Sequence, residues 1–157
     1  MQHRMKTHML TRDQIDQLLI QAATGSLATL GGDGAPYVTP VHYLYHRGAI
    51  YFHGLPKGRK IDNIKADSRV SMTVYEMEGL LLPSDGDPCD VNTKYQSVIL
   101  SGKASLVEDI EHKRAVLMEL VKKYTPHLAG IAPPENMLKG TAVVQIEILD
   151  ITGKYYD

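Results

Sequence analysis

The densest group of chemically active side chains in this 157-residue sequence follows a β-compatible run that ends at His53. A Gly-Leu-Pro turn leads from this run into a short stretch with helical periodicity, residues 58–66. The start of that stretch holds three cations and one glycine: Lys57, Gly58, Arg59 and Lys60. Cations are normally placed at the carboxyl end of a helix, because the free N–H groups at its start already carry partial positive charge.

A bound phosphate would compensate for this arrangement. Its oxygens would accept hydrogen bonds from the N–H groups at the helix start while pairing with Arg59 and Lys60. The alternative is a solvated basic turn that holds no ligand. The residue types by themselves leave both interpretations open.

His53 is the candidate for proton chemistry beside this turn. In a strand over residues 49–53, Ile50 and Phe52 share one face, and the imidazole of His53 lies on the other. If Ile50 and Phe52 fill the core, His53 points toward a ligand or a subunit contact. An imidazole next to a bound electron carrier can hydrogen-bond it or donate a proton to a reduced substrate. The alternative is a purely structural histidine.

Other candidate sites are weaker. His42 and His46 have the spacing of metal ligands on a helix, but a strand separates them by roughly 13 Å, so we expect no metal site. The acidic side chains near Cys89 lack the glycine and the closing glutamate of a calcium loop, and they disfavour a reactive thiolate. The phosphate-binding motifs of Rossmann folds and P-loops are absent.

The remaining sequence predicts the elements that position these residues. Thr11 and Gln14 form a capping-box pattern that begins an amphipathic helix ending at Gly25. The Gly-Gly-Asp-Gly cluster 31–34 indicates a hairpin turn. The β-compatible runs are residues 26–30, 37–44, 49–53, 69–77, 95–107 and 141–151. Further helices are predicted over 58–66 and 109–124, and the long segments 78–94 and 127–139 read as a possible functional flap and a connection.

Successive hairpins without βαβ alternation favour an α+β fold, mainly β, in which helices pack on an antiparallel barrel or sandwich. The length suits a single domain over residues 11–157, preceded by a flexible terminus, residues 1–10. A net charge of −1 argues against nucleic-acid binding. Cys89 is the only cysteine, which fits the reducing cytoplasm, and no apolar run is long enough to span a membrane.

The order of several short motifs resembles the pyridoxamine 5'-phosphate oxidase-related FMN-binding proteins, and within them the nitroimidazole-resistance (Nim-type) branch. After the hairpin cluster come Thr39-Pro40-Val41, the strand that ends at His53, and Gly58-Arg59-Lys60. Further along, the run 95–99 leading to Gly-Lys-Ala at 102–104 and the closing Gly153-Lys154 complete the resemblance. It covers nearly the whole chain.

The resemblance implies a six-stranded antiparallel split β-barrel with flanking helices that forms a homodimer, with FMN bound where the subunits meet. Arg59 and Lys60 would then hold the phosphate, together with Lys57 and Gly58. Three residues, Thr39, Pro40 and Val41, would run along the isoalloxazine ring, with His53 beside it. Tyr95 and Ser97 would reach the cofactor from the partner chain.

The resemblance therefore implies an FMN-dependent oxidoreductase that reduces nitro-aromatic, 5-nitroimidazole-like or other small electron-poor substrates. A non-catalytic flavin carrier or sensor is the alternative from another class. Vitamin B6 oxidation is a third possibility, disfavoured because the C-terminal extension of the true oxidases has no counterpart after Tyr156. The sequence does not identify the physiological substrate or the electron donor.

Overall fold

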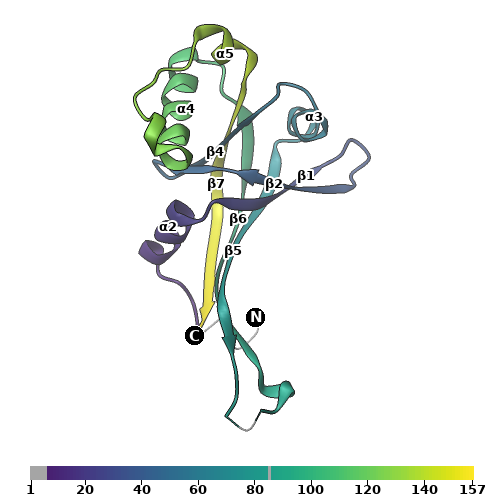
Figure 1. The fold of residues 1–157 in the computed structure, drawn as a ribbon. Helices are drawn as coiled ribbons and strands as arrows, with labels where there is room; N and C mark the ends of the chain where they lie inside the picture. The colour runs from purple at the N-terminus through teal and green to yellow at the C-terminus, as the bar shows by residue number, and fades with distance from the viewer. Residues whose placement is uncertain (1–6, 85) are drawn as a thin grey trace.

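The computed structural model describes residues 7–84 and 86–157, which form one antiparallel sheet with helices packed on it (Figure 1). The helices are α2 (Arg12–Gln21), α3 (Arg59–Ala66), α4 (Ile110–Tyr124) and α5 (Glu135–Gly140), with short 3-10 turns at Pro88–Asp90 and Pro126–Leu128. The strands are β1 (Thr24–Leu30), β2 (Pro36–His42), β3 (Leu44–His46), β4 (Ala49–Gly54), β5 (Arg69–Leu81), β6 (Asn92–Leu106) and β7 (Ala142–Tyr156). The structure is therefore mainly β, in agreement with the predicted fold class.

The sheet has seven strands in the order β2-β1-β5-β6-β7-β4-β3. Its two outermost strands, β2 and β3, follow one another in the chain with only Tyr43 between them. The sheet therefore curls until its edges approach, which gives a split-barrel-like shape without complete closure. Six strands were predicted; the difference arises because the predicted run 37–44 divides at Tyr43, where the chain leaves β1 and pairs with β4 instead.

The main core fills the inside of this curved sheet. Its central side chains are fully buried and come from different strands and from α2: Leu19, Leu27, Ile50, Phe52, Met72, Val98 and Ile146. The predicted capping box of α2 is confirmed: the Thr11 hydroxyl accepts from the N–H of Gln14 (3.3 Å), and the Thr11 N–H donates to the Gln14 side chain (2.8 Å). Burial of Ile15, Leu18 and Leu19 on one helix face then fixes α2 against the sheet.

A second core lies on the outer face of β4, where α4 and α5 pack. Leu117 and Leu120 of α4 and Leu138 of α5 are buried against Tyr51 and Val143. Strand β4 is consequently buried on both faces along most of its length, and His53 near its end is exposed. The prediction that Ile50 and Phe52 face the core is confirmed.

The structure corrects the predicted flap over residues 78–94. Strand β5 continues to Leu81 and β6 already begins at Asn92, opposite it, so the two strands form a long projecting hairpin (Figure 1). A bulge between Met77 and Gly79, where Gly79 has φ +151°, interrupts the register. The alternation of apolar and polar side chains therefore breaks there, and the sequence did not reveal that the strand continues.

Further boundaries differ from the predictions: α2 ends at Gln21, and Gly25, its predicted end, lies in β1. Strand β7 runs to Tyr156 rather than ending at residue 151, and the connection 127–139 contains α5. Residues 1–10 were predicted to be a flexible terminus, but Met9 and Leu10 contact the end of the sheet. Met9 forms a β-bridge with Lys154, and Leu10 is buried and donates its N–H to Gly153 O (3.0 Å). The first six residues lie outside the described part.

Candidate functional site

The predicted cationic turn forms the start of α3. Gly58 is the N-cap residue, with φ +122°, a conformation that favours glycine. No side chain in the described part of the chain caps this helix start, so its first N–H groups are available to an external acceptor. Arg59 and Lys60 occupy the first turn, together with one acidic residue, Asp62. Lys57 lies just before them and is exposed.

Buried contacts fix α3 against the sheet. Ile61 and Ile64 are buried in the main core. The Asn63 side chain, itself buried, donates to the Thr29 hydroxyl of β1 at 3.0 Å. The helix start is therefore positioned by the packed part of the molecule rather than by its exposed cations.

The two cations of α3 contact aromatic rings on two different strands. The guanidinium carbon of Arg59 lies 4.6 Å from the ring centroid of Tyr37 on β2. The ammonium of Lys60 lies 5.0 Å from the ring centroid of Phe52 on β4, and its burial lowers the pKa of Lys60. The start of α3, β2 and β4 thus meet in one place.

Thr39, Pro40 and Val41 lie on β2, at one edge of the sheet. Val41 points into the core, Pro40 is exposed and Thr39 is half-buried. One side of an edge strand has no strand partner, so its backbone groups on that side can contact a flat ligand. Proline is tolerated at such an edge because no ladder donor is needed there.

His53 lies beside this edge. Partial desolvation lowers the pKa of His53 below its ordinary value, and the nearby charges of His42 and Lys60 lower it further. The imidazole is therefore mainly neutral near pH 7. His42 and His53 form a close pair, because both line the same groove and the charge of His42 acts on His53. Sequence reasoning considered His42 only as a metal ligand with His46 and missed this pairing.

His42 and His53 are among the residues that line an apolar groove of about 620 Å³. The groove runs between α4 and the segment 128–137. The side chains that line it are His42, His53, Leu117, Leu120, Val121, Tyr124, Thr125, Leu128, Ile131, Ala132, Pro133, Pro134, Met137 and Thr141. Of the predicted flavin-binding residues only His53 lines this groove, which was not expected because its apolar wall comes from α4 and from a segment interpreted only as a connection.

Tyr95 and Ser97 lie elsewhere in the chain, on β6. Ser97 is buried between Tyr75 of β5 and Lys154 of β7, its pairing partners. The structure does not bring either residue to the start of α3 within one chain. Their predicted contact with a cofactor through a partner chain remains a prediction.

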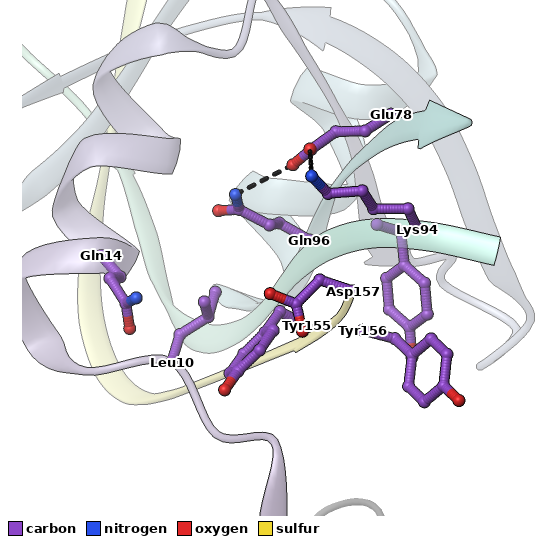
Figure 2. A pocket seen from close by; sticks show the side chains of 9 residues that line it. Leu10, Gln14, Glu78, Lys94, Gln96, Tyr155, Tyr156 and Asp157 are labelled. Atoms are coloured by element: carbon purple, nitrogen blue, oxygen red, sulfur yellow. Dashed lines mark hydrogen bonds and ion pairs between the residues drawn. The ribbon is translucent and has the colours of Figure 1, made fainter. Parts of the chain in front are cut away.

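Tyr95 borders a second, more polar pocket of about 240 Å³ next to α2 and the end of β7 (Figure 2). There Glu78 accepts from Lys94 (3.1 Å) and from the Gln96 amide (3.1 Å), and these contacts lower the pKa of Glu78. The side chains of Glu78, Lys94 and Gln96 thus pair with one another. We therefore place the candidate site at α3, β2 and β4.

The described residues offer neither a metal centre nor a membrane-spanning helix. Within residues 7–84 and 86–157, histidine, cysteine and carboxylate side chains do not gather in any group of three that could hold a metal ion. His42 and His46 lie on different strands, β2 and β3. None of the helices in the same part of the chain has the length and apolar character needed to cross a membrane.

Comparison with known proteins shows the family. Residues 11–155, nearly the whole chain, match the family model described as pyridoxamine 5'-phosphate oxidase. No curated protein matches the sequence significantly.

Solved structures share the fold over most of their length. A candidate 5-nitroimidazole antibiotic resistance protein from Bacteroides thetaiotaomicron VPI-5482 is 24% identical, with a TM-score of 0.80 over 93% of this chain and 85% of that one. The FAD and heme binding protein from Mycobacterium smegmatis is 18% identical, with a TM-score of 0.84 over 94% and 72%. The flavocytochrome Anf3 from Azotobacter vinelandii is 22% identical, with a TM-score of 0.81 over 94% and 68%. At these identities the similarity establishes the fold alone.

Proposed function

The chain belongs to the pyridoxamine 5'-phosphate oxidase family, and we propose that it binds FMN and acts as an FMN-dependent oxidoreductase on small electron-poor molecules. The observation that carries the proposal is the uncapped start of α3, which carries Arg59 and Lys60 and brings Lys60 close to His53. Flavin proteins among its structural neighbours support it.

The start of α3 fits the phosphate of FMN. A phosphate monoester is a dianion, and it would receive hydrogen bonds from the free N–H groups after Gly58. Arg59 and Lys60 would supply the balancing charge, and Lys57 lies close enough in the chain to add to it. Because Arg59 already stacks on Tyr37, its side chain is held near the helix start before any ligand binds.

The edge of β2 fits the flavin ring. The ring would lie along the backbone of Thr39, Pro40 and Val41, with His53 at its side. Since the pKa of His53 is lowered, its neutral imidazole would hydrogen-bond the ring near pH 7 rather than act as a fixed positive charge. Bound FMN would supply the electrons, while the protein binds and orients it and limits its contact with water.

A nitro-aromatic compound is the proposed substrate class. One electron pair and two protons would convert its nitro group to a nitroso group with loss of one water, and two further electron pairs with four protons would give the amine with loss of a second water. Each pair requires one reduced flavin, which an external donor must recharge. His53 is the described side chain best placed to hold a proton for this step. The single cysteine suits work in a reducing cytoplasm.

We also propose that the protein is a homodimer through the outer face of the β5–β6 hairpin. On this face Tyr75, Met77 and Ile99 are each 53% exposed, while the adjacent Val74 and Val98 on the opposite faces of the two strands are buried. Tyr95 and Ser97 lie on the same face, opposite Met77 and Tyr75. A second copy covering it would remove this apolar surface from water and bring Tyr95 and Ser97 to the interface.

The test begins with the purified protein. Bound flavin should absorb near about 450 nm, and chromatography of the released cofactor should show FMN; release of FAD would refute the FMN assignment. Dithionite-reduced protein is then titrated with a 5-nitroimidazole without oxygen. Reoxidation of the flavin accompanied by amine formation supports the enzyme, whereas a flavin that stays reduced supports the carrier or sensor. Oxidation of pyridoxamine phosphate would instead indicate vitamin B6 chemistry.

A further inference from the structure

The groove between α4 and the segment 128–137 has a lining without ionic groups. None of its described lining residues is an aspartate, glutamate, lysine or arginine. Leu117 and Leu120 of α4 are buried in its wall, and Ile131 and Met137 are exposed at its rim. A charged ligand would lose hydration there without gaining a counter-ion, whereas an uncharged apolar ligand would gain from leaving water.

The polar groups of the groove divide into two kinds. The hydroxyls of Tyr124, Thr125 and Thr141 already donate to backbone oxygens, at 2.6, 3.1 and 2.7 Å. In contrast, no group in the described part of the chain hydrogen-bonds a ring nitrogen of His42 or His53. The free hydrogen-bond donor capacity of the groove therefore lies with His42 and His53, and His53 is near Lys60 at the start of α3.

The size of the groove sets the size of the ligand. A cavity of about 150 Å³ accommodates benzene, and this groove holds about 620 Å³. A single nitroimidazole ring would fill only a small part of it. A ligand with several fused rings, or with one ring and a long apolar substituent, would fill it.

From these observations we propose that the groove binds an uncharged, largely apolar ligand, larger than a nitroimidazole, whose one polar end hydrogen-bonds His42 and His53. That this ligand is the substrate rests on the proposed function, because His53 also belongs to the proposed flavin site. Binding itself can be measured separately from flavin chemistry.

The experiment uses two dyes with the same rings. N-phenyl-1-naphthylamine is uncharged, and 8-anilino-1-naphthalenesulfonate carries a sulfonate; both fluoresce in apolar surroundings. With the flavin-loaded protein we expect the uncharged dye to bind at one site and at least tenfold more tightly than the sulfonate. Equal or tighter binding of the sulfonate would overturn the inference, and so would competition between the uncharged dye and FMN.

Variants locate the bound dye. Ile131→Arg puts a charge at a rim position that is 66% exposed, and Val121→Trp fills the groove with apolar bulk. Each should weaken dye binding at least tenfold. Leu149→Arg is the matched control, because Leu149 is 60% exposed and lies on β7 outside the groove lining. Circular dichroism checks that each variant folds.

The outcomes separate this inference from the proposed function. Wild-type dye affinity in Ile131→Arg would overturn the groove assignment even if flavin is bound. If Ile131→Arg instead dissociates a dimer, as measured by light scattering, the groove is a contact between copies and the inference is wrong. Absence of flavin in a protein that still binds the dye in the groove would refute the proposed function alone.

Discussion

Removing both cations of the α3 start tests the phosphate site directly. In the variant Arg59→Ala/Lys60→Ala, the free N–H groups after Gly58 remain but the balancing charges are lost. A hydrogen bond to a charged group contributes about 1.5–3 kcal/mol. Arg59 is exposed and solvent screens its charge, so the lower value is appropriate for both, and the total loss is about 3 kcal/mol. That corresponds to a dissociation constant for FMN about 100-fold higher.

Riboflavin provides the decisive comparison, because it carries the same ring without the phosphate. Fluorescence titration should show that wild-type protein prefers FMN, and that the double variant binds FMN and riboflavin almost equally. Riboflavin affinity itself should change little. Equal loss of affinity for both flavins would refute the reasoning, because it would show that the cations support the ring or the fold rather than the phosphate.

Lys65→Ala is the matched control on the same helix. Lys65 is an exposed cation in the last turn of α3, at the opposite end from the proposed phosphate. It should leave FMN affinity nearly unchanged; a loss similar to that of the double variant would mean that general positive charge is responsible. The double variant should remain folded, because it forfeits two cation–π contacts, of about 0.5–1 kcal/mol for the exposed Arg59 and about 2 kcal/mol for the half-buried Lys60 over Phe52.

Three further predictions follow from the packing and the charges. Gly102→Ala should lower the free energy of unfolding by about 1–3 kcal/mol in urea denaturation, because the alanine Cβ would overlap a backbone oxygen of β7. Gly140→Ala is the control and should leave the free energy of unfolding unchanged, because open space surrounds Gly140. In NMR titration His42→Gln should raise the pKa of His53, and an unchanged pKa would contradict the proximity of the two histidines. In the wild-type protein, the contribution of His53 to stability should be lost as pH falls below about 6.5, because the unfolded chain binds the proton more readily than the folded chain. Tyr75→Arg should shift the protein from dimer to monomer in light scattering, and a dimer that persists would exclude this face as the interface.

Local patterns predicted much of the fold because they depend on neighbouring residues. The capping box of Thr11 and Gln14 formed as expected, and the glycine cluster after β1 forms a hairpin in which Leu30 pairs with Pro36. The apolar spacing of Ile61 and Ile64 likewise placed α3 correctly. The residues 78–94 were misread because a bulge and short apolar pairs break the alternation, and only pairing across the hairpin stabilises these strands.

The sequence alone determined the types of chemistry available: three cations at a helix start, one histidine at a strand end, and a β-compatible run that carries Pro40. Only the tertiary structure decided what surrounds them. The curling of the sheet brings His42 next to His53, and the packing of α4 against β4 forms the groove between them and the segment 128–137. Such contacts join residues far apart in the chain, so no local periodicity encodes them. They form because apolar faces are buried in two separate cores.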